Sequence, residues 1–538
     1  MSFTTRFAIG ASSLALAALC FQATAQTPQI VPFAKTADLL IGDNFTSKIL
    51  RCSDLTADGD YDDAGEVTLY FDPAVALDPN TGLPYGAAKM GNPLAMAVDM
   101  MGWVYVADGG TTRTLFRIRD VDGDGDANDA GESSIFFDPA NAAGINNFAL
   151  QGVIATDTGH IYATIAGQGS GFTTIDRLVK LIDSNGDGDA NDAGEQAIVW
   201  DRATAVTNGN TSLDSPAWIG TLPDGTLYIS NGNANNQGIW RLADQPATPD
   251  GIFNDAGEVT HIYGGANGNP PPKFTFCARF GQDGRMYLVN ITDKRIIAAT
   301  DVNANGIYDD AGEAAAFATS GDGGITISAM FGVDVRDDGT VVLGDTGGSP
   351  NNRLIGYKDL NFNGVASDPG EQTVLLSFNT TTFPTAKARS LQFLPREPKP
   401  FGVGRISSSG SFLGFGAAPS GGLPKVGNPN FALQVVQAPI GVQAGLFYSD
   451  VTNPIPFTTL APGLSDPNSL LYPDVFNPGF GGQLAPGLTD VFGTGAFPLP
   501  IPPLPSLAGK TFTVQGFVID FASLFPIVFS NALELTFL

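Results

Sequence analysis

Histidine is nearly absent from this chain: among 538 residues, only two histidines occur, His160 and His261. Zinc sites built on histidine, serine–histidine–aspartate triads and a histidine general base are therefore disfavoured. We expect His160 at the start of a second strand of its repeat and His261 on an outermost strand, both as surface or packing residues. The sequence also has neither a Gly-x-Ser-x-Gly elbow nor a glycine-rich phosphate loop followed by Lys and Ser or Thr.

Basic residues are scarce as well, with 27 Lys and Arg against 54 Asp and Glu, and the net charge is −27. A surface this acidic argues against nucleic acid or an anionic membrane as a partner. After residue 25, no run is long and apolar enough to span a bilayer. The apolar content of 43% nevertheless supports sizeable cores, and the length suits two or more domains.

Residues 1–25 show the pattern of a secretory signal peptide. Arg6 precedes an apolar run over 7–21, and Ala23-Thr24-Ala25 supplies the small residues of a cleavage site. We therefore expect an exported protein, located in the periplasm, at the cell surface or outside the cell.

Only two of the three cysteines remain after this signal, Cys52 and Cys277. They fall in the first and fifth of the repeats described below, so we expect two buried thiols rather than a disulfide. An exported chain without a disulfide framework needs another source of stability, and binding of external calcium suits that role.

One acidic loop recurs six times, roughly every 60 residues, which is typical of repeat architectures. Its clearest copy runs from Asp120 to Glu132, with acidic or amide residues at positions 1, 3 and 5, glycine at position 6 and glutamate at position 13. The copies span Asp54–Glu66, Asp120–Glu132, Asp183–Glu195, Asp244–Glu258, Asp301–Glu313 and Asp359–Glu371.

This pattern of oxygen-bearing side chains predicts several structural Ca²⁺ ions, because Ca²⁺ takes six to eight oxygen ligands. The alternative is a set of Asp/Asn/Gly-rich turns without an ion. Thr56 at position 3 of the first copy and Pro246 in the longer fourth copy predict weaker or empty sites there. The candidate ligands are Asp54, Asp58, Asp60, Glu66, Asp120, Asp122, Asp124, Asp126, Glu132, Asp183, Asn185, Asp187, Asp189, Glu195, Asp250, Glu258, Asp301, Asn303, Asn305, Glu313, Asp359, Asn361, Asn363 and Glu371.

The first half of the loop resembles the calcium loops of EF-hand and dockerin proteins. The closing glutamate falls one position later than in an EF-hand, and no helical pattern flanks the loop. The resemblance therefore implies that the loop binds calcium, with an arrangement of ligands that differs from the EF-hand.

Each repeat reads as four short strands. In the unit 93–139, apolar and β-branched runs at 94–98, 103–107, 115–119 and 134–137 alternate with Gly, Asp and Asn turns. The first repeat starts at Ala37 and lacks an innermost strand, whereas 390–394 is a strand without a partner after the sixth repeat. Such a strand closes a β-propeller by completing its first blade. We predict an all-β chain with six blades.

Several second-strand hairpins resemble the NHL-type blade, which is shared with gluconolactonase and regucalcin propellers. The residues that carry this resemblance are 97–108, 222–230, 280–288 and 332–345. The resemblance covers about residues 37–395 and implies the propeller fold, whereas it says little about activity.

A candidate channel site follows from residues at equivalent ends of second strands, which are Asp43, Asp108, Asn231, Asn290 and Asp345. The gluconolactonase resemblance implies one divalent ion held by such side chains, although the inner strands depart from that family's pattern. The alternative is that these residues only turn the backbone. Arg279 and Arg389 lie on predicted innermost strands, where they face either an anionic ligand or a neighbouring Asp.

Residues 401–538 change composition sharply, with few charges and many Gly, Pro and Phe. We predict an antiparallel β-sandwich whose strands include 431–436, 445–448, 511–519 and 532–537. The segments 514–520 and 531–537 loosely resemble the ends of small terminal modules of exported planctomycete-type bacterial proteins, which implies surface or glycan attachment. A plain packing domain is the alternative.

The sequence thus predicts a signal peptide at 1–25, a propeller at 26–396, a linker at 397–410 and a sandwich at 411–538. Function is expected to be non-catalytic binding of an extracellular ligand, glycan or surface protein. The alternatives are a metal-dependent lactonase or hydrolase and a glycan-active propeller such as a polysaccharide lyase.

Overall fold

The computed structural model describes residues 38–394, apart from short gaps in several loops, and mainly the strands of residues 399–536. The predicted signal peptide and most of the predicted linker lie outside the described residues. Within them, no helix is long and apolar enough to cross a membrane.

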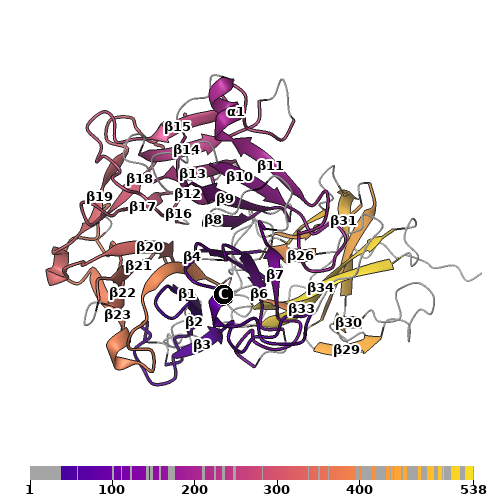
Figure 1. The fold of residues 1–538 in the computed structure, drawn as a ribbon. Helices are drawn as coiled ribbons and strands as arrows, with labels where there is room; N and C mark the ends of the chain where they lie inside the picture. Colours follow the sequence, from indigo (N-terminus) through magenta and orange to yellow (C-terminus); the bar gives the residue numbers. More distant parts are fainter. Residues whose placement is uncertain are drawn as a thin grey trace, which may run out of the picture. The chain divides into compact units, whose positions relative to one another are not determined.

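Residues 39–393 form six four-stranded antiparallel sheets, which are the blades of a β-propeller (Figure 1). The predicted all-β fold and blade count are therefore confirmed. From the innermost strand outward, the first blade contains β24 (Ala388–Phe393), β1 (Leu39–Asp43), β2 (Lys48–Cys52) and β3 (Val67–Phe71), and the second contains β4 (Pro93–Val98), β5 (Val104–Asp108), β6 (Leu115–Ile118) and β7 (Ser133–Phe137). The third blade contains β8 (Ala149–Ala155), β9 (Ile161–Ala166), β10 (Arg177–Leu181) and β11 (Gln196–Asp201), and the fourth contains β12 (Pro216–Thr221), β13 (Leu227–Asn231), β14 (Gly238–Leu242) and β15 (Val259–Tyr263). The fifth blade contains β16 (Ala278–Phe280), β17 (Met286–Asn290), β18 (Arg295–Ala299) and β19 (Ala314–Thr319), and the sixth contains β20 (Met330–Val335), β21 (Val341–Thr346), β22 (Asn352–Tyr357) and β23 (Gln372–Ser377).

The ring closes as the sequence predicts, because β24 completes the first blade. Leu39 pairs with Phe393 and Ile41 with Leu391 in this antiparallel ladder. The chain's last propeller strand thereby joins its first, and neither is left as an open inner edge.

The second strands of the blades form the buried layer of the propeller. All five residues of β5, β13 and β17 are buried. Both faces of such a strand are covered, since the neighbouring blades stack against it, which accounts for continuous apolar runs in place of alternation.

The inner strands of five blades contain a β-bulge near the start of the strand. The register shifts after Pro93 in β4, after Leu150 in β8 and after Pro216 in β12. Similar shifts occur in β20 and in β24. A bulge turns a side chain away from the regular alternation, and here the turned side chains line the central channel.

Every outermost strand also contains a β-bulge. In β3, for example, Leu69 and Phe71 are paired with neighbouring residues of β2, so Tyr70 is left out of the ladder. The same shift leaves out one residue in each of the five other outermost strands, namely Phe136, Val199, Ile262, Phe317 and Leu375.

The C-terminal residues form three further antiparallel sheets. The five-stranded sheet contains β25 (Lys399–Phe401), β34 (Ile527–Thr536), β33 (Thr511–Ile519), β28 (Gln443–Ser449) and β31 (Gly481–Leu488); the others contain β26 (Gly414–Ala417), β27 (Ala432–Val436) and β32 (Gly495–Pro498), and β29 (Thr452–Pro456) and β30 (Leu470–Pro473). Three predicted strands correspond to β27, β28 and β33, and the fourth is part of the longer β34. The stretch predicted as a linker contains β25. The sandwich arrangement itself stays a prediction.

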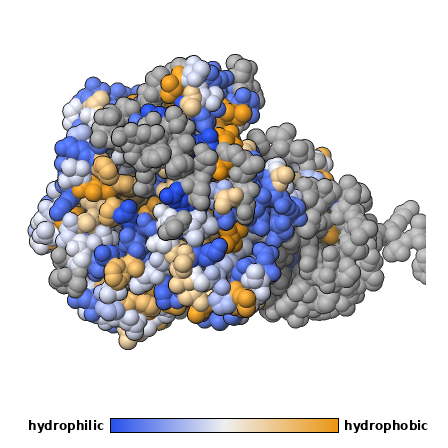
Figure 2. Space-filling view, in the orientation of Figure 1, coloured by the Kyte–Doolittle hydropathy of each residue, from blue (hydrophilic) through white to orange (hydrophobic). Residues whose placement is uncertain are grey.

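Helices are minor features of the described residues. They are α1 (Arg202–Thr207), which Asp201 caps by accepting a hydrogen bond from the Thr204 amide, and three short 3-10 turns at Ala87–Lys89, Asp322–Gly324 and Phe378–Thr380. Figure 2 shows hydrophilic and apolar residues interspersed over the described part of one face.

Candidate functional site

Each acidic loop connects the third and fourth strands of its own blade and bonds to the preceding blade. The amide of Ala127, at loop position 8, donates to the carbonyl oxygen of Tyr70, the bulged residue of β3, at 2.7 Å. The other five loops repeat this bond, and in every one the acceptor is the bulged residue of the preceding outermost strand. These bonds are Ala190 to Phe136, Phe253 to Val199, Tyr308 to Ile262, Ala366 to Phe317 and, across the closure, Tyr61 to Leu375.

Position 9 adds a second bond to the preceding blade in four of the loops. The side-chain oxygen of Asn128 accepts from the Asp72 amide at 2.9 Å, just past the end of β3. Asn191, Asn254 and Asp309 do the same for the next three blades. The second half of each loop therefore covers the edge of an outermost strand that is otherwise open to solvent.

A cation of the preceding blade approaches the first half of several loops. Arg117 lies 3.5 Å from Asp183, and Arg51 lies 3.8 Å from Asp120. Arg336 donates to the Gly59 carbonyl at 3.0 Å, and Arg285 donates to the Gly364 carbonyl at 3.2 Å. These contacts offset part of the negative charge within the loops.

Inside each loop, the position-1 aspartate folds the chain back on itself. Asp301 Oδ2 accepts from the Gly306 amide at 2.7 Å, and Asp359 Oδ2 accepts from the Gly364 amide at 2.8 Å. The glycine at position 6 donates the same bond in the loops that begin at Asp54, Asp120 and Asp183. Gly306 and Gly364 have φ of 78° and 92°, which suits glycine.

The fourth loop keeps this arrangement in spite of its two extra residues. Asp244 Oδ2 accepts from the Gly251 amide at 2.7 Å, and Asp250 Oδ1 accepts from the Ile252 amide at 2.8 Å. Asp244 thus takes the position-1 role, although the predicted ligand set omits it. Its buried Oδ1 has no hydrogen-bond partner among the described residues.

The closing glutamate turns toward backbone amides. Glu313 is 5% exposed, and its two oxygens accept from the Val302 and Asp310 amides, both at 3.0 Å. The equivalent bonds occur at Glu66, Glu132, Glu195, Glu258 and Glu371. In these positions the carboxylate satisfies the loop's own amides.

Position 10, which the sequence-based ligand set omits, faces positions 3 and 5. Asp310 Oδ2 accepts from Asn303 Nδ2 at 2.6 Å and from Asn305 Nδ2 at 2.8 Å. Asp368 makes the same pair of contacts with Asn361 and Asn363, and Asp192 contacts Asn185. Only the folded loop brings these positions together, so residue spacing did not reveal them.

The other predicted ligands lie along the exposed first half of the loops. Asp58, Asp124 and Asp187 at position 5 each accept from the amide two residues later, and Asp126 and Asp189 at position 7 do likewise. Asp60 accepts from the Asp62 amide, and Asp122 lies outside the described residues. Among the residues that are described, no three His, Cys, Asp or Glu side chains group as a metal site.

The polar residues at the ends of second strands are fully buried, and most of them bond to nearby backbone. Asp108 Oδ1 accepts from the Gly91, Asn92 and Gly110 amides at 2.6–3.0 Å. Asp43 accepts from the Lys387 amide, and Asp345 from the Ser328 and Ala329 amides. Asn231 donates to Asp214, and Asn290 donates to the Pro271 carbonyl. The structure uses these side chains for hydrogen bonds within their own blades.

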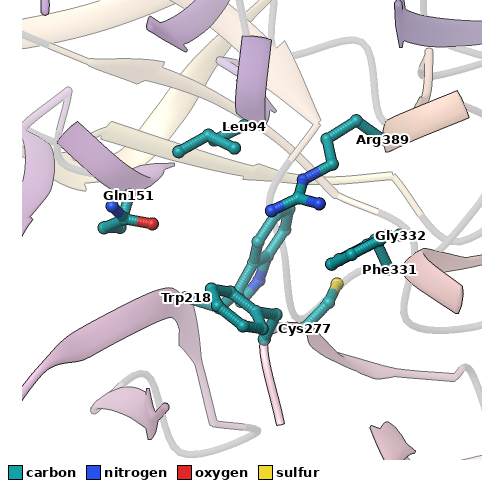
Figure 3. A pocket seen from close by; sticks show the side chains of 8 residues that line it. Leu94, Gln151, Trp218, Cys277, Phe331, Gly332 and Arg389 are labelled. Atoms are coloured by element: carbon teal, nitrogen blue, oxygen red, sulfur yellow. The ribbon is translucent and has the colours of Figure 1, made fainter. Parts of the chain in front are cut away.

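The central channel presents a different set of residues. A narrow cavity of about 10 Å³, which suits one water molecule, lies at the end of the channel where the inner strands begin. Every blade contributes to its wall, and Arg389 reaches toward its centre between the other side chains (Figure 3). The lining includes Leu94, Gln151, Trp218, Phe276, Phe331 and Arg389.

Two arginines in this channel have different surroundings. Arg279 stacks on Trp218 with 4.5 Å to the ring centroid, lies 3.5 Å from Asp334 and donates to Gln392 at 2.9 Å. Arg389 stacks on Phe331 at 3.5 Å and lies 5.7 Å from the Phe276 centroid. Within the described residues, no hydrogen bond or ion pair reaches its guanidinium. Burial lowers the pKa of Arg389 to about 10.

The histidines and cysteines have packing roles. His261 stacks on Trp240 at 4.4 Å, and burial, with the charge of Lys180, lowers the pKa of His160 to about 4. Cys52 and Cys277 are free and buried, as predicted. Burial raises the pKa of the Cys277 thiol, which makes it unreactive at neutral pH.

No protein-family model matches this chain. No curated protein matches it either. Among solved structures, it is similar to a protein of unknown function from Bacteroides caccae, with 10% identity and a TM-score of 0.38, over 67% of this chain and 100% of that one. A catalytically inactive virginiamycin B lyase from Staphylococcus aureus with quinupristin shows 14% identity and a TM-score of 0.33, over 59% and 81%. A putative gluconolactonase shows 12% identity and a TM-score of 0.32, over 58% and 87%. Similarity this low carries no argument about function, and the propeller rests on its own strand pairing.

Proposed function

We propose that this chain is an exported, calcium-stabilised six-bladed β-propeller that binds a ligand without catalysing a reaction. One observation carries the calcium part: all six acidic loops bond to the bulged residue of the preceding outermost strand. An ion that holds the first half of a loop also fixes the half that covers the neighbouring blade. Calcium in this position stabilises contacts between blades.

The proposed ligands in each loop are positions 1, 3, 5 and 10. In the fifth loop these are Asp301, Asn303, Asn305 and Asp310. A rotation of each carboxamide presents its oxygen in place of its nitrogen, which is the atom that Ca²⁺ binds. Glu313 remains with the backbone amides. The orphaned Asp244 Oδ1 supports a cation in the fourth loop as well.

Two observations support a non-catalytic role. The side chains proposed for a lactonase-type metal at the channel mouth, such as Asp108 and Asp345, are occupied as backbone caps. Both histidines are packed, and the pKa of each is lowered by burial, so neither is poised as a base at neutral pH. For the C-terminal sheets, we propose attachment to a surface or glycan.

The decisive experiment measures ion content and melting temperature of the mature chain in calcium and after chelation. We expect about four to six bound Ca²⁺ ions and a large fall in melting temperature on chelation, because each site adds roughly 2.7 kcal/mol when free calcium exceeds Kd about 100-fold. Magnesium at equal ionic strength is the control for general charge screening. Absence of bound calcium together with an unchanged melting temperature contradicts the proposal.

A further inference from the structure

The Arg389 guanidinium is partly buried, and no carboxylate of the described residues forms an ion pair with it. Its faces lie against Phe331 and toward Phe276, but its N–H edges point into the cavity and bond to none of the described residues. Aromatic faces offset part of the desolvation of a guanidinium, whereas the in-plane donors still require acceptors. Arg279 obtains such acceptors from Asp334 and Gln392, whereas none of the described residues supplies one to Arg389.

The β-bulge in β24 directs the Arg389 side chain toward the channel. Ser390 pairs with Gly42, whereas Asp43 pairs with Ala388, so Arg389 is left out of the ladder at the point where β24 enters the channel. Bulges of this kind occur where a side chain must be redirected, often beside a binding site. Arg389 is therefore held toward the channel by the backbone of its own strand.

We propose that Arg389 binds the carboxylate group of a small ligand that has an apolar or aromatic body. A carboxylate offers two acceptors in the geometry of a guanidinium fork. The space beside Arg389 suits one water molecule, so one carboxylate oxygen takes the place of that water and the lining side chains shift to admit the second. The body rests against the aromatic and aliphatic wall formed by Phe276, Phe331 and Leu94. This inference rests on the proposed binding role and specifies its ligand class.

The test compares two probes with the same body and different head groups, phenylacetate and phenylacetamide. Isothermal titration calorimetry of the full mature chain, kept in calcium, gives the affinity of each. We expect phenylacetate to bind about tenfold or more tightly than phenylacetamide, because only the acid offers a charged bidentate acceptor. The acid must be recovered unchanged, as a binding role requires.

Three variants locate the effect. Arg389→Gln keeps polarity without the charge, and we expect it to bind both probes equally. Lys387→Gln is the matched control, because Lys387 lies over Phe45 at 5.3 Å and does not line the cavity. This control should keep the preference for the acid. Arg389→Lys retains charge but loses the fork, and we expect an intermediate preference, which also serves if Arg389→Gln does not fold.

Three results overturn the inference: equal affinity of the wild-type chain for the two probes, no detectable binding of phenylacetate at millimolar concentration, or an undiminished preference in Arg389→Gln and Arg389→Lys. Each is distinguishable from failure of the proposed function, which is judged by calcium content and by melting after chelation. A chain that binds calcium as expected and ignores phenylacetate keeps the first proposal and loses this one.

Discussion

The acidic loops and the channel wall use the same sixfold repetition in opposite ways. Around the outside, every loop has Asp at position 1, Glu at its close and the same bond to the preceding blade. Along the channel, the blades present different side chains at comparable places. Leu94 is apolar, Gln151 is polar and Arg389 is charged. Both sets of residues lie at or against β-bulges.

This contrast separates two demands on a repeat protein. The edge of an outermost strand is the same structural problem in each blade, so one solution recurs six times. Recognition of an asymmetric ligand instead requires different chemistry from each direction, so the wall diverges. The divergence of the channel wall is what the proposed ligand-binding role requires of it.

The largest effect is expected from Arg279→Met, which tests whether the two channel arginines differ as their surroundings indicate. Removal of Arg279 leaves the buried Asp334 without its cation, which costs roughly 3–5 kcal/mol of unfolding free energy. Arg389→Met is the matched variant and should change that free energy little, because no buried partner is lost. Urea unfolding of both variants provides the measurement.

The loss in Arg279→Met should also depend on pH. Burial raises the pKa of Asp334, and the charge of Arg279 now opposes that rise. Without Arg279, the folded-state pKa rises further above its unfolded value, so the destabilisation is fully present at neutral pH and shrinks as the pH falls through the folded-state pKa. Equal losses of unfolding free energy in Arg279→Met and Arg389→Met would show that the two channel arginines do not differ in this way.

Asp301→Asn tests the outer loops. The substitution removes one anionic ligand at position 1, and we expect one Ca²⁺ fewer and a loss of roughly 2–3 kcal/mol in calcium. Val302→Ala is the matched control, since Val302 is 74% exposed at the next position. After chelation the Asp301→Asn variant should melt close to the wild-type chain, and a defect of the same size with and without calcium argues against a metal role.

Asp310→Asn and Glu313→Gln distinguish the two acidic residues at the end of one loop. We expect Asp310→Asn to lower the number of bound ions by one, because Asp310 faces positions 3 and 5. Glu313→Gln should retain the ion and lower stability by about 1–2 kcal/mol, because two amide bonds weaken. Ion counting by native mass spectrometry decides between them, and a reversed result restores position 13 as the ligand.

At neutral pH, the smallest effect is expected from His160. Burial lowers its pKa to about 4 from an ordinary value of 6.5, so the unfolded chain binds the proton more tightly between these values. Stability from the neutral form is therefore complete above pH 6.5 and declines as the pH falls toward 4. His160→Gln should flatten this part of a plot of melting temperature against pH. An unchanged plot shows that His160 does not contribute to the decline.

The sequence predicts most of the propeller because its signals are local. Runs of β-branched residues separated by turn residues mark the four strands of each blade. The strand predicted at 390–394, which has no partner in its own repeat, marks the closure of the ring. The bulges depend on register between strands, which single-chain patterns do not contain. Likewise, only the fold shows that Asp334 of the sixth blade neutralises Arg279, that no carboxylate of the described residues pairs with Arg389, and that Asp310 contacts Asn303 and Asn305.

The bond from each loop to the blade before it has a consequence for the order of folding. As the chain is synthesised, the edge of each blade stays uncovered until the next loop has been made, about 60 residues later. The sixth edge is the exception, because Tyr61 covers Leu375 from a segment made at the outset. Assembly can thus advance blade by blade, with one slow, long-range step at the end, in which β24 and the first loop join the two ends of the ring.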